Sequence, residues 1–114
     1  MKKNVILDLS FEFALEIIDY VDILEEKRKY VIAKQLLKSG TSIGANIREA
    51  QSAESKADFI HKFKIADKEI KETEYWLLLC QKAEKYPTPN IEIFSHLKSI
   101  ENISSKIIIT SKKR

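Results

Sequence analysis

The sequence predicts an all-α protein, an antiparallel up-down-up-down four-helix bundle with residues 1–114 as a single domain. Three observations favour this fold. The chain has only two glycines and two prolines, too few for a turn-rich sheet protein. Apolar residues make up 44% and charged residues 32% of the chain, a composition that argues against disorder. Apolar side chains recur at helical spacings of three and four in four segments, about 9–27, 30–52, 55–85 and 89–110.

The first segment combines a wide apolar face with a narrow acidic one. Residues 1–27 carry three lysines and seven acids, a net charge of −4, so this helix is the acidic part of a chain with a net charge of +3. The wide face is expected to be buried in the bundle. Its members are Phe11, Phe13, Ala14, Leu15, Ile17, Ile18, Val21 and Leu24.

The second segment is predicted to be one continuous helix despite two internal glycines. Gly40 and Gly44 lie four residues apart on its apolar face, and each costs about 1 kcal/mol relative to alanine in a helix interior. A compensating use is close approach of a neighbouring helix, because residues four apart share one face. Both glycines are therefore predicted to be helix-packing positions.

The third and fourth helices have recognisable start signals. Ser55 can cap the third helix, with Asp58 in its first turn. In the turn-rich stretch before the fourth helix, Thr88 is the expected N-cap and Pro89 the first helical residue. The third helix has a strict 4-3-4-3 repeat, formed by Phe59, Phe63, Ala66, Ile70, Thr73, Leu77 and Cys80.

The third helix also carries apolar residues away from this repeat. Tyr75, Trp76 and Leu79 make its C-terminal half apolar nearly all round. One intramolecular core cannot cover every side of a helix in so small a bundle. These three residues are therefore candidates for the interface of a homo-oligomer.

Catalytic and metal-binding groups are sparse, so an enzyme is not expected. His61 stands beside lysines, and the pair Glu92 and His96 offers two metal ligands where a zinc site needs three or four. Cys80 falls on the third helix's apolar repeat, where cysteine is usually a small hydrophobe. There is no glycine-rich phosphate loop before a helix. Neither a cofactor nor a metal is expected.

Compartment and membrane association follow from simple counts. A single cysteine cannot form an intramolecular disulfide, and no charged-then-apolar leader opens the sequence. We therefore expect a cytoplasmic protein. The apolar run at 76–80 is far shorter than the roughly 20 residues needed to span a bilayer, so no membrane partner is expected.

A basic stripe on the third helix is a candidate nucleic-acid site. His61, Lys64, Lys68 and Lys71 follow spacings of three, four and three, which align them on one face. Further positive charge comes from Lys112, Lys113 and Arg114, expected as a short basic tail. Such a stripe can follow a phosphate backbone. The alternative is a solvated face with ordinary i,i+4 pairs, Lys68 with Glu72 and Asp67 with Lys71.

Two polar residues near the end of the second helix leave a further question open. Asn46 and Glu49 are three apart and are candidates for helix packing. One interpretation is a polar network that links either residue to the third helix. The other is a helix flank that faces water.

The segment LKSGTSIGANIREA at 37–50, followed by SKADFIHK at 55–62 and KEIKETEYWL at 68–77, resembles the four-helix-bundle family encoded in intervening sequences of bacterial 23S rRNA genes. The resemblance implies a homopentamer around a central channel, with no established enzymatic activity. Accessory proteins of diversity-generating retroelements are similar in fold, and they bind nucleic acid and a reverse transcriptase through a basic surface.

Two hypotheses follow from the sequence. The first is an oligomeric bundle that binds RNA or DNA without sequence preference. The second is a structural or protein-interaction module whose partner is another protein. The fold resemblance favours the first, but fold alone does not define a site.

Overall fold

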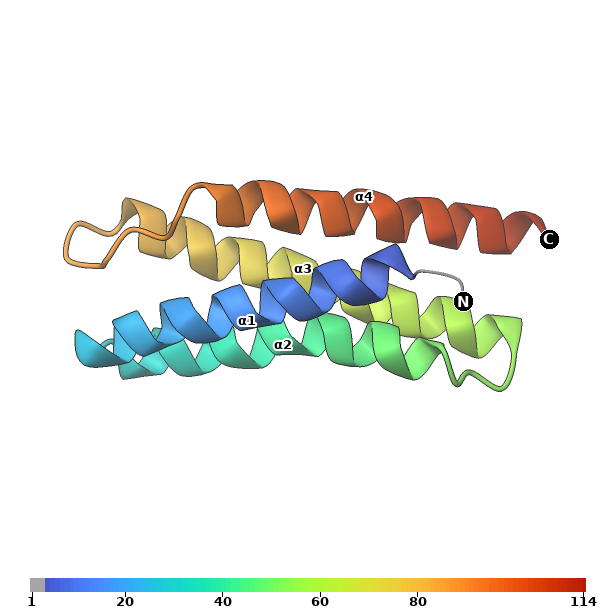
Figure 1. Cartoon of the computed structure of the whole chain (residues 1–114), viewed down its shortest axis with the longest axis horizontal. Coiled ribbons are helices and arrows are strands. Elements are labelled where there is room, and N and C mark those ends of the chain that lie inside the picture. The colour runs from blue at the N-terminus through green and yellow to red at the C-terminus, as the bar shows by residue number, and fades with distance from the viewer. Residues whose placement is uncertain (1–3) are drawn as a thin grey trace.

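The structure is a computed structural model that describes residues 4–114. Within that range the chain forms four helices, α1 (Val5–Glu26), α2 (Tyr30–Ala50), α3 (Lys56–Lys82) and α4 (Glu92–Lys113), and no strand. Each helix runs antiparallel to the one before it, and α4 returns to pack against α1 (Figure 1). The prediction of an all-α antiparallel four-helix bundle is confirmed.

The start of α1 lies earlier than the apolar pattern indicated. The helix begins at Val5 and not at residue 9, because Asn4 supplies an N-cap. The Asn4 side-chain oxygen accepts a hydrogen bond from the backbone N–H of Leu7 at 3.3 Å, which satisfies one of the amide groups that a helix leaves unpaired at its start.

The cap expected for α3 is confirmed, and the one expected for α4 is wrong. Ser55 Oγ accepts a hydrogen bond from the N–H of Asp58 at 3.0 Å. By contrast, α4 begins three residues after Pro89, at Glu92. Asn90 takes the role expected of Thr88, and its Oδ1 accepts from the N–H of Glu92 at 3.0 Å. The helix ends also differ from the prediction, since α2 stops at Ala50 and α3 at Lys82.

The connections at one end of the bundle are held by specific contacts. The short turn between α1 and α2 contains Arg28 in the left-handed region, with φ 62°. The longer α3–α4 connection is fixed at two points. Tyr20 of α1 donates a hydrogen bond from its hydroxyl to the carbonyl of Pro87 at 2.5 Å, and Lys29 Nζ lies 4.7 Å from the ring centre of Tyr86.

The core runs along the bundle axis and is apolar apart from a few hydroxyl groups. Thr73 donates a hydrogen bond to Ser39 Oγ at 2.9 Å across the α2–α3 interface, and both side chains are fully buried. On α4, the Ser104 side chain is also fully buried. No helix in the described range is both long and apolar enough to cross a membrane.

Candidate interaction surfaces

The outward side of α1 is the main difference from the predicted core. Phe11, Leu15 and Ile18 were expected to be buried, but they are 53%, 43% and 41% exposed. The reason is that α1 packs only against α2 and α4, so part of its wide apolar face has no intramolecular neighbour. The same helix contains seven acids and no lysine or arginine. Its outward side is therefore both acidic and apolar.

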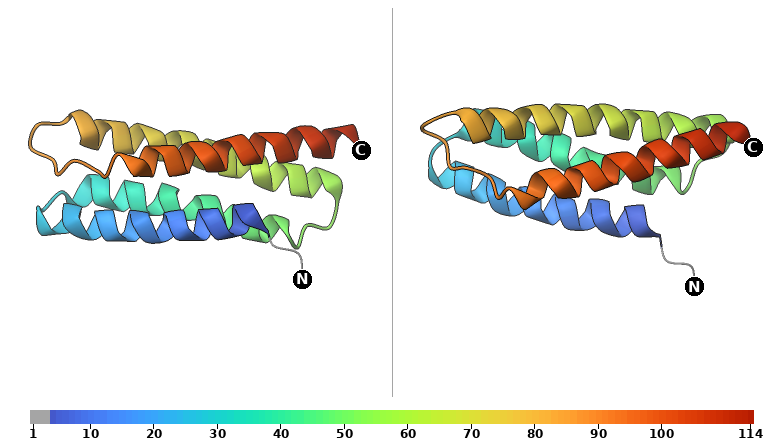
Figure 2. Two further views of the ribbon diagram at one scale, coloured as in Figure 1. Left: turned by 45° about the horizontal axis from the view of Figure 1, so that its top comes forward. Right: turned by 90° about the horizontal axis from the view of Figure 1, so that it is seen from above.

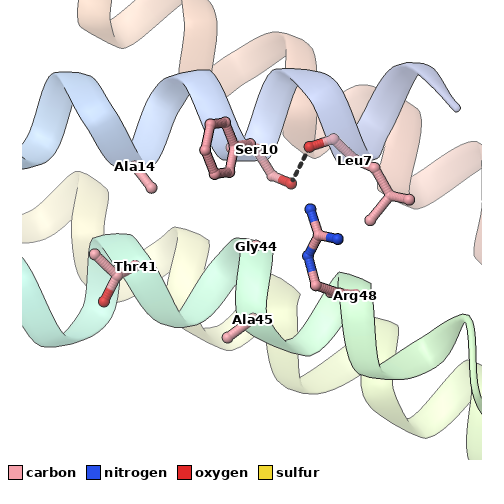
Figure 3. Close-up of a pocket in the computed structure, with 8 residues that line it drawn as sticks. Leu7, Ser10, Ala14, Thr41, Gly44, Ala45 and Arg48 are labelled. Carbon is pink, nitrogen blue, oxygen red and sulfur yellow. Dashed lines mark hydrogen bonds between the residues drawn. The ribbon is translucent and has the colours of Figure 1, made fainter.

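A narrow groove runs between α1 and α2, and small residues form its base. Its volume is about 120 Å³. Figure 3 shows Ser10 and Ala14 of α1 above Gly44 and Ala45 of α2, with the Arg48 guanidinium reaching toward α1. Leu7, Phe11 and Thr41 complete the lining. The small side chains let the two helices approach closely.

The two glycines of α2 differ in how closely α1 approaches them. A Cβ atom on Gly40 would lie 2.8 Å from Cγ1 and 2.9 Å from Cγ2 of Ile17. Real side chains do not tolerate such contacts, so Gly40 is a position of enforced close packing. A Cβ on Gly44 would lie 3.3 Å from Ser10 Oγ, which is tight but can be relieved by a small shift.

Asn46 and Glu49 make different contacts. Asn46 stays on its own helix and donates from Nδ2 to the carbonyl of Ser42 at 2.8 Å, so a link from Asn46 to α3 is not formed. Glu49 does reach α3, where it accepts a hydrogen bond from Lys62 Nζ at 3.0 Å. This contact raises the pKa of Lys62. It is an exposed ion pair, which is worth little stability.

The basic stripe of α3 is exposed, and its lysines are not equivalent. Lys71 pairs with Glu101 of α4, which also accepts from Lys98. The hydrogen bond from Lys71 lowers the pKa of Glu101 and raises that of Lys71. Among residues 4–114, Lys64 and Lys68 form no ion pair. The expected pairs Lys68–Glu72 and Asp67–Lys71 are likewise not formed in that range.

The basic C-terminus is part of α4 and not a tail that leaves the fold. Lys112 and Lys113 are exposed in its last turn, beside Arg114. Lys56 at the start of α3 donates from Nζ to the backbone carbonyl of Arg114. A shallow hollow of about 340 Å³ lies nearby and is lined partly by Phe59, Lys106 and Arg114. Cationic groups from both helices thus gather at this end.

Tyr75, Trp76 and Leu79 contribute unequally to the exposed surface of α3. Tyr75 is 57% and Leu79 40% exposed, and Leu78 beside them is 42% exposed. Trp76 is instead partly buried against the core of the bundle, and its Nε1 donates a hydrogen bond to Glu72 Oε2 at 3.2 Å. The apolar surplus on α3 is therefore carried by Tyr75, Leu78 and Leu79.

The histidines and the cysteine do not converge on one site. His96 contacts Glu16 of α1, with Nδ1 to Oε1 at 2.7 Å, and does not pair with Glu92 as its spacing indicated. Cys80 is buried, and burial raises the pKa of its thiol. Residues 4–114 contain no cluster of three potential metal-binding side chains among His, Cys, Asp and Glu.

The outward face of α1 is the feature that sequence reasoning missed. Its signal was present, because apolar residues occupy more of the α1 circumference than two neighbouring helices can cover. The periodicity predicts core packing for that whole width, and it predicts surplus apolar surface only on α3.

Comparisons with known proteins identify a family and a similar solved structure. The family model described as 23S rRNA-intervening sequence protein matches residues 2–108. A solved protein of unknown function from the S23 ribosomal protein family of Bacteroides thetaiotaomicron is 45% identical, with a TM-score of 0.68. The similarity covers 93% of this chain and 94% of that one. No curated protein matches the chain.

Proposed function

The chain belongs to the 23S rRNA-intervening sequence protein family, and we propose that it is a non-enzymatic, self-assembling bundle that holds RNA or DNA on a basic face. It acts in the cytoplasm, without a metal or an organic cofactor. The observation that carries the nucleic-acid part is the state of Lys64 and Lys68. Both are exposed on α3 and, in the described range, neither is engaged by a carboxylate.

Unpaired lysines are the groups that nucleic acid can use at low cost. A lysine that already pairs with a carboxylate must give up that partner before it contacts a phosphate, whereas Lys64 and Lys68 need only release water and counterions. The cationic group at the end of α4, Lys112, Lys113 and Arg114, extends the positive surface. Contacts of this kind give affinity without sequence preference.

Self-assembly is supported by apolar surface that one copy leaves uncovered. Phe11, Leu15 and Ile18 on α1 and Tyr75 and Leu79 on α3 are all at least 40% exposed. Surface of this kind marks interaction sites when it is contiguous. The resemblance described above implies five copies in a ring, and we propose a pentamer. Repetition of the two lysines around a ring multiplies the phosphates engaged and steepens the salt dependence.

A mobility-shift titration tests the nucleic-acid part. The parent and the variant Lys64→Gln/Lys68→Gln are titrated against RNA and DNA of several sequences, at about 50 mM salt and at higher salt. We expect binding that falls steeply with salt, and a loss of affinity in the variant that is similar for every sequence. The control is Lys82→Gln/Lys85→Gln, which removes two exposed lysines elsewhere and should leave binding close to that of the parent.

A structural module with a protein partner is the second candidate. It is favoured by the charge of α1, because the seven acids of that helix would repel a phosphate backbone. If the parent assembles but binds neither RNA nor DNA at about 50 mM salt, the nucleic-acid proposal is wrong and the protein-interaction function remains.

A further inference from the structure

One helix of this bundle has surface chemistry unlike the other three. The outer face of α1, defined here as Phe11, Glu12, Leu15, Ile18 and Asp19, is at least 40% exposed at its three apolar members, and both acids are exposed. Neither Glu12 nor Asp19 takes part in an ion pair within residues 4–114. A surface that is apolar and uniformly acidic fits a partner surface that is apolar and basic.

The neighbouring helix presents a surface of that kind. The outer face of α2, defined here as Val31, Lys34 and Lys38, carries two exposed lysines and the most exposed of the large apolar side chains, Val31 at 81%. Lys34 and Lys38 are four residues apart and share one side of the helix. Like the acids of α1, they have no ion-pair partner in the described range.

We propose that the outer face of α1 docks on the outer face of α2 in a second copy of this chain. The proposal rests on the self-assembly put forward above and names the two surfaces that meet. The acids of one copy then face the lysines of the next, and Phe11, Leu15, Ile18 and Val31 are removed from water together. Within one copy these faces cannot meet, because both point away from the shared core.

The positions of the two helices determine what kind of assembly this contact builds. In the left view of Figure 2, α1 and α2 lie on one side of the bundle, and α3 and α4 on the other. The helices α1 and α2 occupy neighbouring corners of the bundle. Their outer faces therefore point in directions that differ by roughly a right angle. A head-to-tail contact between two such faces rotates each copy relative to the last, and such a rotation builds a small ring when it closes.

The contact also leaves the nucleic-acid surface accessible. In a ring joined through α1 and α2, the groove of Figure 3 faces the central axis, since it lies between the two docking faces. Lys64 and Lys68 on α3 then lie on the outside. The competing arrangement, α1 on the basic stripe of α3, joins opposite corners of the bundle. It would give an open filament and would cover both lysines.

A charge-swap experiment tests the pairing. Variant A reverses α1 with Glu12→Lys/Asp19→Lys, variant B reverses α2 with Lys34→Glu/Lys38→Glu, and variant AB combines them. Assembly is followed by light scattering over a dilution series at about 100 mM salt, and helix content by circular dichroism. We expect A and B each to raise the concentration for half-assembly by about tenfold or more, and AB to return it to within about threefold of the parent.

Two control variants make the result specific. Glu54→Lys/Glu84→Lys changes the net charge as variant A does, at exposed loop positions, and should assemble like the parent. Variant A combined with Lys64→Glu/Lys68→Glu offers the alternative partner face on α3. Rescue of assembly by that combination, and not by AB, would show that α1 docks on α3 and would overturn the proposal.

The outcomes separate this inference from the proposed function. A parent that is a single 13.2 kDa species at every concentration contradicts self-assembly itself. If the parent assembles and neither variant A nor variant B changes the concentration for half-assembly, self-assembly stands but these two faces are not the interface. Loss of assembly in A without recovery in AB also rejects α2 as the partner face. Only loss in both A and B with recovery in AB supports the pairing.

Discussion

The hydroxyl of Thr73 donates a hydrogen bond to Ser39 Oγ at 2.9 Å, in the middle of the apolar interface between α2 and α3. Neither side chain is accessible to solvent. A buried hydroxyl is costly without a partner, so each of these residues is acceptable there because of the other. The pair fixes the register of α2 on α3, since a shift along the helix axis would separate the two oxygens.

We expect the double change at this pair to cost less than the sum of the two single changes. Thr73→Val leaves Ser39 with only a long 3.5 Å bond to the carbonyl of Leu36, and Ser39→Ala leaves the Thr73 hydroxyl without an acceptor. Each should lower the free energy of unfolding by about 1–3 kcal/mol. Urea titration should show that the double variant loses less than the sum. Strict additivity would contradict the coupling.

Substitutions at the two glycines of α2 should change the free energy of unfolding by different amounts. Gly40→Ala places a Cβ against the branched Ile17 side chain, and overpacking should cost about 1–3 kcal/mol. Gly44→Ala should stay within about 1 kcal/mol of the parent, because higher helix propensity offsets its milder contact. Gly44→Leu should be destabilising by about 1–3 kcal/mol, with Gln35→Leu, an exposed position of α2 outside the groove, as its control. Thermal melts compare the four, and a Gly44→Leu variant as stable as the parent would contradict close contact.

Asp67 should make the folded protein less stable as pH rises. Burial raises the pKa of its carboxyl, and the hydrogen bond from Ser104 opposes that shift. The folded pKa is above the unfolded one, so the stability linked to its proton is present below the unfolded pKa and lost as pH rises through the folded value. Asp67→Asn should therefore gain stability over the parent as pH increases from acid to neutral. Urea midpoints at several pH values measure it.

A second variant tests the cause assigned to the Asp67 shift. Ser104→Ala removes the hydrogen bond that favours the charged carboxylate, so the pKa of Asp67 should rise further and the pH window of lost stability should extend upward. An unchanged pH profile in both variants would show that Asp67 is not the group responsible.

Lys71 should matter less for nucleic-acid binding than its two neighbours in the stripe. Because it is paired with Glu101, a phosphate gains less from it than from Lys64 or Lys68. In mobility-shift titrations, Lys71→Gln should weaken binding less than either Lys64→Gln or Lys68→Gln. Glu101→Gln frees Lys71 and should strengthen binding at low salt. Equal effects of all three lysine changes would mean that the ion pair does not persist in the complex.

Much of the fold was predictable because local patterns determine it. The 4-3-4-3 repeat of α3 placed Phe63, Ile70 and Leu77 in the core, and all three are buried. The cap at Ser55 was predictable as well, because it depends only on residues within one turn. The start of α4 was not, because Thr88 and Asn90 are both good caps, and the anchored path of the connection decides between them.

The surfaces were harder to predict because they depend on contacts between distant segments. Periodicity shows which side of α1 is apolar, but it does not show how many helices will pack on that side, so Phe11, Leu15 and Ile18 were assigned to the core. The partner of Lys71 could not be identified either. Glu101 lies 30 positions away on another helix, whereas the spacing rules consider only residues within a turn.

The anchored connection between α3 and α4 bears on the order in which the bundle folds. Tyr20 and Pro87 are 67 positions apart, so their hydrogen bond forms only after α1 and the α3–α4 connection have come together. The turn between α1 and α2, by contrast, closes locally, and local contacts form first. We expect α1 and α2 to form an early hairpin and α4 to dock last. Amide hydrogens of α4 should then exchange with solvent by partial opening, ahead of those in α2.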